Sequence, residues 1–333
     1  MTALQAPEGK NYVVRPPVEP LETTFPLTYV WSYETQKDDV RALYEKAKRE
    51  QWNATDQLSW HVEVDPEKEN MPDMMLPIYG SHIWNRLTQK EILRLRHHGF
   101  AWILSQFLHG EQGALLATAQ IALSVPSVDA KFYASTQVMD EARHVEVYER
   151  YLREKLELHY PVNLHLKQLL DQILSDARWD MKYLGMQILV EGLALAAFKY
   201  IHTFAAEPLI KELTHYIMRD EARHVAFGVL SLREFYAHGM SEKERRERQE
   251  FTYEACLLMR DRFLAKEVWE NLGLPVEECA ELALRSPSMQ EFRKLLFSRI
   301  VPNIKRLGLL DSWLAEKFEQ LGILRFQNEP ADA

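Results

Sequence analysis

The stretch DEARHV occurs at residues 140–145 and again, unchanged, at residues 220–225. At ordinary residue usage, a coincidental match of this length in such a chain has a probability of roughly a few in a thousand. A further glutamate stands 30 residues before the glutamate of each copy. A shift of 80 residues therefore maps three chemically active side chains onto three others: Glu111, Glu141 and His144 onto Glu191, Glu221 and His224.

The spacing within each copy suits a helix, because residues three apart lie on one face about one turn apart. Apolar residues recur with a helical period around these positions and predict four long helices, at about 100–124, 128–157, 179–205 and 208–238. Two of these helices carry Glu-x-x-His and two carry a single Glu. No stretch of the sequence has a convincing strand pattern. We therefore predict an all-α protein built on an antiparallel four-helix bundle.

The rest of the chain is expected to flank this bundle. Residues 1–35 are rich in proline and lack apolar periodicity, which indicates an extended arm. Residues 36–333 are predicted to form one helical domain whose core spans about 100–238. Additional helices are expected at about 38–51, 87–93, 163–176, 242–271, 287–305 and 312–321, with capping boxes at Thr88/Glu91 and Ser241/Glu244.

Composition and charge limit the possible partners. The net charge is −9 and basic residues are interleaved with acidic ones, which argues against a nucleic-acid surface. The N-terminal residues lack the pattern of a secretory signal, and no apolar run is expected to cross a bilayer. Because Cys256 and Cys279 are the only cysteines, we expect no disulfide framework and a reducing, cytoplasmic location.

Four carboxylates and two imidazoles gathered along a bundle axis create an electrostatic problem. Ionised carboxylates in an apolar interior suffer desolvation and mutual repulsion, each costing on the order of several kcal/mol. Glu191 shows the difficulty, since it stands in the apolar stretch LVEGLALAAF. Two divalent cations would balance four carboxylates, and a mixed oxygen and nitrogen ligand set suits iron or manganese. A structural repeat without metal remains the alternative, because an isolated Glu-x-x-His usually lies on a solvated helix face.

The doubled Asp-Glu-x-Arg-His motif resembles that of the ferritin-like di-iron carboxylate proteins. It is most similar to their oxygen-activating branch, which includes bacterial multicomponent monooxygenase hydroxylases, acyl-carrier-protein desaturases and ribonucleotide reductase small subunits. The resemblance covers residues 100–238 and implies a ferritin-like bundle with Asp140 and Asp220 each accepting a hydrogen bond from the metal-bound histidine of the opposite motif. Arg143 and Arg223 would then be counter-charges. The implied metal ligands are Glu111, Glu141, His144, Glu191, Glu221 and His224.

This sequence differs from each subfamily at particular positions, and these differences limit which subfamily's reaction can be expected of it. Multicomponent monooxygenases have a threonine one turn after the third glutamate, where this chain has Leu195. The p-aminobenzoate N-oxygenase group has a third histidine one turn before the glutamate of its second motif, where this chain has Ile217, so N-oxygenation by that particular site is not expected. Reductase small subunits commonly begin their ligand set with Asp and end in an acidic, aromatic tail, whereas this chain has Glu111 and ends in NEPADA. Ferritins are shorter and lack the doubled motif with both histidines.

Two pairs related by the 80-residue shift differ in residue type. Tyr148 stands one turn after His144, at the position of the radical-bearing tyrosine of many reductase small subunits, and its counterpart is Gly228. Gln137 stands one turn before the first motif glutamate, and its counterpart is Ile217. The exchange of Tyr for Gly predicts free space beside the metals. Tyr148 is either a catalytic residue or a buried aromatic of the core, and both interpretations remain open.

The sequence therefore predicts an O2-activating di-iron oxygenase or oxidase acting on a small organic molecule by hydroxylation, desaturation or N-oxidation. The expected cofactor is two iron ions, with Mn/Fe as the other possibility and O2 as co-substrate. No flavin, nicotinamide or iron–sulfur motif is present, so an external electron donor, a reductase or ferredoxin, is expected, as is a homodimer. The alternatives are a radical-generating oxidase similar to reductase small subunits, an iron-handling ferritin-like protein and a metal-free scaffold.

Overall fold

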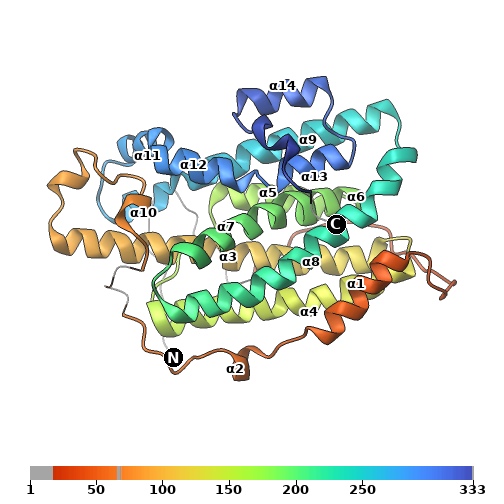
Figure 1. The fold of residues 1–333 in the computed structure, drawn as a ribbon, viewed down its shortest axis with the longest axis horizontal. Coiled ribbons are helices and arrows are strands. Elements are labelled where there is room, and N and C mark those ends of the chain that lie inside the picture. Colours follow the sequence, from red (N-terminus) through yellow and green to blue (C-terminus); the bar gives the residue numbers. More distant parts are fainter. Residues whose placement is uncertain (1–17, 66–67, 69, 332–333) are drawn as a thin grey trace.

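The computed structural model describes residues 18–65, 68 and 70–331. Within them every regular element is a helix, which confirms the predicted all-α, ferritin-like class. The bundle consists of α3 (Gln89–Ser124), α4 (Val128–Tyr151), the continuous stretch from α6 to α7 (Trp179–Phe204) and α8 (Pro208–His238), and Figure 1 shows α3, α4 and α8 running side by side along the long axis.

Local sequence signals set the starts of the bundle helices. The capping box at Thr88 and Glu91 is present, but it opens the 36-residue α3 rather than a separate short helix. Residues 94–99, which lay between the two helices expected at 87–93 and 100–124, are inside that helix. Ser127 caps α4 by accepting a hydrogen bond from Ala130 N, and Glu207 caps α8, whose first residue is a proline.

The third bundle helix was expected to be continuous over 179–205 but contains a wide segment. An α-helical start, α6 (Trp179–Tyr183), is followed by the π-helical η4 (Leu184–Val190) and then by α7 (Glu191–Phe204). Such segments are rare in helices and are found frequently at functional sites. Here the π-helical turn ends immediately before Glu191, and α3 has no such turn before Glu111.

The C-terminal part also differs from the expected helices. The segment expected at 242–271 is divided into α9 (Glu242–Asp261), a 3-10 turn η5 (Arg262–Leu264) and α10 (Lys266–Asn271). The segment expected at 287–305 is divided as well, and one helix was not anticipated, α11. These last helices are α11 (Val276–Arg285), α12 (Pro287–Leu296), α13 (Ile300–Arg306) and α14 (Ser312–Gln320).

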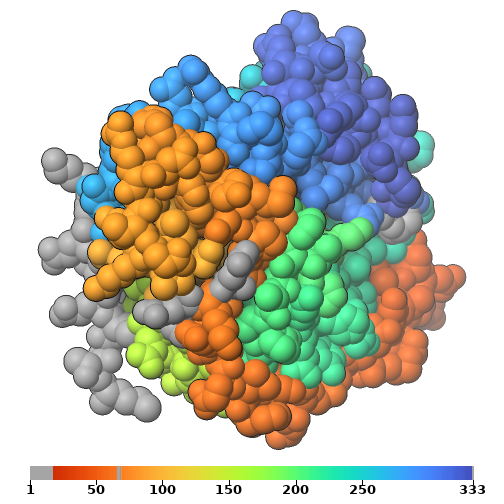
Figure 2. All heavy atoms as spheres, turned by 60° about the vertical axis from the view of Figure 1, so that its left-hand side comes forward, coloured from red at the N-terminus to blue at the C-terminus, as the bar shows by residue number. Residues whose placement is uncertain are grey.

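Flanking elements cover the bundle on several sides. Helix α1 (Asp38–Arg49) packs on α4 and α8, and α5 (Leu164–Ser175) packs on α3 and α9. Figure 2 looks onto the end of the bundle where α7 meets α8, and the orange segment preceding α3 lies there between that turn and the C-terminal helices. Short elements complete the chain: α2 (Ala54–Gln57), η1 (Asp73–Met75), η2 (Trp84–Arg86), η3 (Leu152–Leu156) and η6 (Leu324–Asn328).

The described part of the N-terminal arm, residues 18–35, contains neither helix nor strand. It is held to the bundle by a hydrogen bond from Thr28 N to Leu123 O (3.0 Å) and by one from the Thr23 hydroxyl to Leu174 O (3.1 Å). The rest of the expected arm, residues 1–17, lies outside the described residues. The division into an arm and a single helical domain stays a prediction.

Among the described residues, the helical stretch Trp179–Phe204 is long and apolar enough to cross a membrane by length and composition alone. However, 78% of its apolar window is buried inside the protein. Burial on this scale is typical of a core helix of a bundle, whose apolar residues pack against neighbouring helices.

The space predicted beside Gly228 is filled. A Cβ atom built on this residue would lie 2.6 Å from Gln187 Cβ and 3.0 Å from Ile188 Cδ1, both in the π-helical segment. The glycine therefore allows α8 and η4 to approach closely and leaves no room for a ligand at that point.

We expect Gly228→Ala to lower the free energy of unfolding by about 1–3 kcal/mol, because the added methyl group overpacks a helix contact. Urea denaturation monitored by circular dichroism measures the change. Gly99→Ala is the matched control, since its nearest contact would be an ordinary 3.8 Å to Leu76 Cδ2, and it is expected to be neutral or stabilising by up to about 1 kcal/mol. Equal effects of the two substitutions would contradict the close-approach explanation.

Candidate metal centre

The six side chains related by the 80-residue shift meet inside the bundle. Helix α3 positions Glu111, α4 positions Glu141 and His144, the first residue of α7 is Glu191, and α8 supplies the last pair. None is more than 5% exposed. Their ligand atoms form two groups within which all atoms lie within 4.8 Å of one another: Glu111, Glu141, His144 and Glu221 in one, and Glu141, Glu191 and His224 in the other.

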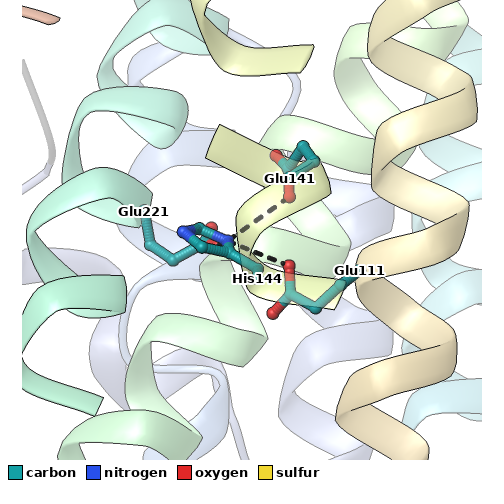
Figure 3. Close-up of side chains that lie close together, drawn as sticks. All are labelled: Glu111, Glu141, His144 and Glu221. Atoms are coloured by element: carbon teal, nitrogen blue, oxygen red, sulfur yellow. Dashed lines mark hydrogen bonds and ion pairs between the residues drawn. The ribbon is translucent and has the colours of Figure 1, made fainter. Parts of the chain in front are cut away.

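The first group is centred on the imidazole of His144. Its Nδ1 lies 3.2 Å from Glu111 Oε2, 3.2 Å from Glu221 Oε1 and 3.6 Å from Glu141 Oε2. Figure 3 shows these four side chains pointing toward one another from three different helices. Three carboxylates and one nitrogen thus converge on a single point in the core.

The second group repeats this arrangement around His224. Its Nδ1 lies 3.2 Å from Glu141 Oε1, 3.5 Å from Glu221 Oε2 and 3.9 Å from Glu191 Oε2. Glu141 and Glu221 therefore lie near both imidazoles, whereas Glu111 lies near one and Glu191 near the other. The ring centroids of His144 and His224 are 6.0 Å apart.

The opposite nitrogen of each imidazole faces an aspartate of the other motif. His144 Nε2 lies 3.1 Å from Asp220 Oδ2, and His224 Nε2 lies 3.3 Å from Asp140 Oδ2. These are the two contacts that the resemblance implied. If each Nε2–H donates to its aspartate, each Nδ1 keeps its lone pair directed at the carboxylate cluster, which is the tautomer that a metal ligand requires.

The two arginines of the motifs connect the two aspartates. Arg143 donates to Asp140 and, at 3.2 Å, to Asp220, while Arg223 donates to Asp220 and, at 3.4 Å, to Asp140. Burial alone would raise the pKa of Asp220, but the hydrogen bond and charge of His144 and the charge of Arg223 lower that pKa overall. Both aspartates are thus placed among positive groups, as expected of residues that orient an imidazole.

The part that the residues just after α1 take in this network was not predicted from the sequence. Trp52 Nε1 donates to Asp220 Oδ2 (2.7 Å), and Gln51 Nε2 donates to Asp140 Oδ1 (2.9 Å). Glu50 accepts a hydrogen bond from Arg223 Nη1 (2.8 Å). The only signal in the sequence is the polar and aromatic run EQW, which is also an ordinary way to end an amphipathic helix.

The pair Gln137 and Ile217, which are related by the 80-residue shift but differ in residue type, has a structural explanation. Gln137 Nε2 donates to Glu141 Oε1 and to Glu191 Oε1, both at 2.9 Å, and the side chain is fully buried. Its counterpart Ile217 is also fully buried and offers no polar atom. One end of the cluster is thus held by an amide, and the other end is not.

Charge in the cluster is unbalanced without cations. Burial raises the pKa of Glu111 well above its usual range, and the charge of Glu221 raises it further. Burial and the charge of Glu141 do the same to the pKa of Glu191. Buried acceptors also lack a hydrogen-bond partner among the described residues: Glu141 Oε2, Glu191 Oε2, Glu221 Oε2 and His224 Nδ1. These residues fit a pair of divalent cations, which would neutralise the carboxylates and engage the unpaired atoms.

Tyr148 lies at the side of the cluster formed by Glu111. Its ring is fully buried between Phe107 (centroid distance 5.9 Å) and Phe198 (6.0 Å). Its hydroxyl has no hydrogen-bond partner among the described residues. Burial raises the pKa of this phenol well above its usual value, and the charge of Glu111 raises it further, so the phenol stays protonated.

A small cavity borders the cluster between α3, α7 and η5. Three of the acidic residues line it, Glu111, Glu191 and Glu221, together with apolar side chains such as Phe107 and Phe198. Its volume is about 20 Å³, which is room for one molecule the size of water. The cavity gives a small molecule a place next to the carboxylates.

The chain was compared with protein families, curated proteins and solved structures. The family model described as p-aminobenzoate N-oxygenase AurF matches residues 34–308. Two solved structures of R2-like ligand-binding oxidase variants with an aerobically reconstituted Mn/Fe cofactor have 18% and 17% identity, each with a TM-score of 0.49, covering 82% of this chain and 93% of theirs. At these values the likeness carries no information about reaction or substrate. No curated protein is similar enough to count as a match.

Proposed function

This chain belongs to the p-aminobenzoate N-oxygenase AurF family, and we propose that it oxidises a small amine with O2 at a pair of iron ions. The enzyme is an O2-activating oxidoreductase of the di-metal carboxylate type. The observation that carries the proposal is the buried cluster of carboxylates and imidazoles in two adjoining groups. The small cavity beside that cluster has room for one molecule the size of water, so it would admit only the reacting group of the substrate.

Each of the six residues has a role in this proposal. Glu141 and Glu221, which lie near both imidazoles, would be shared by the two cations, and the other four residues would each serve one: Glu111, His144, Glu191 and His224. Asp140 and Asp220 are positioning residues that hold the imidazoles through Nε2. When bound, reduced iron would supply the electrons that activate O2 toward the substrate.

Apolar walls would keep water away from the reacting molecule. Phe107, Leu193 and Phe198 line the cavity, and the phenol of Tyr148 lies behind two of these rings. A low-polarity lining strengthens the electrostatic contacts inside the cavity and limits side reactions with water. Burial raises the pKa of the carboxyl groups of Glu111 and Glu191, which favours their protonated forms when no cation is bound.

Oxidation of an amine nitrogen is the reaction favoured by family membership. Ile217 favours a second candidate, oxidation of a C–H bond, because an apolar side chain stands where the N-oxygenase group is expected to have a third histidine. The family model matches most of the chain, whereas Ile217 changes a single expected ligand position. A member of the family can therefore lack the third histidine. We place N-oxidation first.

The test is anaerobic loading with Fe(II), removal of unbound iron and mixing with O2 and p-aminobenzoate in the presence of a chemical reductant. We expect about two irons per chain and O2-dependent addition of oxygen to the amine, followed by mass spectrometry. Benzoate serves as the comparison, since it offers only C–H bonds. Oxygenation of benzoate alone would favour the second candidate, and a chain that binds no iron would contradict the proposal. Iron far above two per chain would indicate iron handling.

Four further features remain proposals: the identity of the metal pair, the electron donor, the homodimer and the location. Parallel loading with Mn(II) and Fe(II) would distinguish Fe/Fe from Mn/Fe. A separate reductase or ferredoxin is proposed as electron donor, because Cys256 and Cys279 are both buried and are too few for an iron–sulfur cluster. A homodimer and a cytoplasmic location are also proposed, and sedimentation analysis and cell fractionation test them.

For Tyr148→Phe we expect full iron content and unchanged thermal stability, because the deleted hydroxyl makes no hydrogen bond. Electron paramagnetic resonance after O2 exposure is expected to show no persistent tyrosyl radical in the wild type. Tyr133→Phe is the matched control, since this buried hydroxyl also has no partner. A persistent signal that disappears in Tyr148→Phe and survives in Tyr133→Phe would instead establish a radical-generating oxidase.

A further inference from the structure

Arg262 occupies an unusual position at the break between α9 and α10. It begins the 3-10 turn η5, which ends at Leu264 and is followed by Ala265, a non-glycine residue with a positive φ of 49°. This break turns the side chain inward, so that Arg262 is only 5% exposed. Its side chain lines the same cavity as Glu111, Glu191 and Glu221.

The guanidinium of Arg262 has no acidic partner within ion-pair distance and no side-chain hydrogen bond to any residue in the described ranges. Its Nε is buried without a partner, and the one contact of its charge is with the ring of Phe263, 5.0 Å away. Other buried arginines of this chain each have an acceptor for the guanidinium: Arg143 and Arg223 pair with aspartates, Arg248 with Asp180, and Arg293 with backbone carbonyls. Burial lowers the pKa of Arg262 to about 10, so its charge persists at neutral pH.

The carboxylate cluster does not account for this cation. Four glutamates carry four negative charges, and two divalent cations would balance them. Arg262 would then be a buried positive charge without a counter-ion, which is costly unless something pairs with it. An anion entering the cavity would remove that cost. The unpaired guanidinium therefore indicates what kind of molecule the cavity receives.

The apolar side chains around Arg262 indicate that the rest of the bound molecule is apolar. Phe107, Leu193 and Phe198 line the cavity that contains Arg262. The next residue, Phe263, lines a second cavity of about 120 Å³ together with Phe100, and this cavity is apolar throughout most of its wall. Both cavities lie between α3, α7 and the turn that carries Arg262 and Phe263, so one molecule with an apolar body could use space from both if the side chains between them move.

We propose that Arg262 is the residue of this chain that binds the carboxylate of its substrate, an organic acid with an apolar body like the p-aminobenzoate for which the family is described. The inference rests on the proposed function, because it concerns the substrate of that site. A guanidinium offers two parallel N–H donors that match a carboxylate, and the match is strongest away from water. Arg262 is thus a specificity-determining residue that selects an anion and fixes its orientation relative to the cations.

Binding measurements on the Fe(II)-loaded protein under anaerobic conditions test this assignment. Isothermal titration compares benzoate with benzamide, its neutral counterpart, in the wild type and in Arg262→Gln. We expect the wild type to prefer benzoate, and Arg262→Gln to lose roughly tenfold to a hundredfold of the benzoate affinity with little change for benzamide. Equal benzoate affinity in the two proteins, no preference for benzoate in the wild type, or no benzoate binding at all would overturn the proposal.

Arg248→Gln is the matched control, since it removes a buried arginine of α9 that is paired with Asp180 at 3.0 Å. It should lower the melting temperature and leave benzoate binding unchanged. Arg262→Gln should not lower the melting temperature, because it removes a charge that lacks a partner. A clear loss of stability in Arg262→Gln with normal benzoate binding would make the residue structural.

Iron content separates failure of this inference from failure of the proposed function. Wild type and Arg262→Gln should both bind about two irons, because Arg262 is not among the six proposed ligands. If both bind iron and consume O2 while benzoate affinity is unaffected by the substitution, only the role of Arg262 is wrong. If the wild type binds no iron, the proposed function itself is wrong.

Discussion

Glu141→Ala and Glu221→Ala should each leave the protein with less than about one iron per chain, whereas the wild type binds about two. Each of these carboxylates lies near both imidazoles, so its loss would remove a ligand from both proposed cation sites at once. The substitution also removes one of four negative charges needed to balance two divalent cations. Iron analysis after anaerobic loading and desalting measures the result.

Glu146→Ala is the control for this experiment. Glu146 is an exposed residue of α4 only two positions after His144, so its loss changes the same helix without touching the cluster. Its iron content should equal that of the wild type. Two irons in both Glu141→Ala and Glu221→Ala would refute the assignment of the ligands.

Asp220→Ala should weaken iron binding by about 10–100-fold while the bundle stays folded. The carboxylate orients His144 through Nε2 and also accepts hydrogen bonds from Trp52 and Arg143. Without it the imidazole can rotate and can protonate at the wrong nitrogen. Competition with a chelator gives the affinity, and far-ultraviolet circular dichroism monitors the fold.

Asp140→Ala should behave similarly, because Asp140 makes the equivalent contact with His224. Asp171→Ala serves as the control, since this aspartate is 38% exposed and, among the described residues, forms an ion pair with Lys167 one turn away in α5. Unchanged iron affinity in both Asp140→Ala and Asp220→Ala would show that these acids do not orient the imidazoles.

Much of the metal centre was predictable from the sequence, because the spacing of its residues is local and occurs twice. Glu141 and His144 are three residues apart on one helix, and the same spacing recurs 80 residues later with the same upstream glutamate. A helical period then forces these side chains onto inward faces. The cross-contacts between each aspartate and the opposite histidine followed from the resemblance rather than from the spacing.

Contacts between distant segments were not predictable in this way. Trp52 donates to Asp220 across 168 positions, and nothing near Trp52 in the sequence distinguishes it from other aromatic residues that end a helix. Arg262 is similar, because its lack of a partner is a property of the packed interior. The filled space at Gly228 depends on the π-helical segment beside it, and a single sequence does not reveal where a helix widens.

The reciprocal pairs Asp140 with His224 and Asp220 with His144 bear on how such a chain could have arisen. In each pair, a residue of the first repeat contacts a residue of the second, and the mirror contact is also present. Contacts of this kind are the mark of a twofold axis between identical subunits. If the two repeats descend from one duplicated gene segment, the ancestral hairpin could not have oriented its own histidine. It would have held metal only as a symmetric pair of chains, and fusion made that partnership permanent.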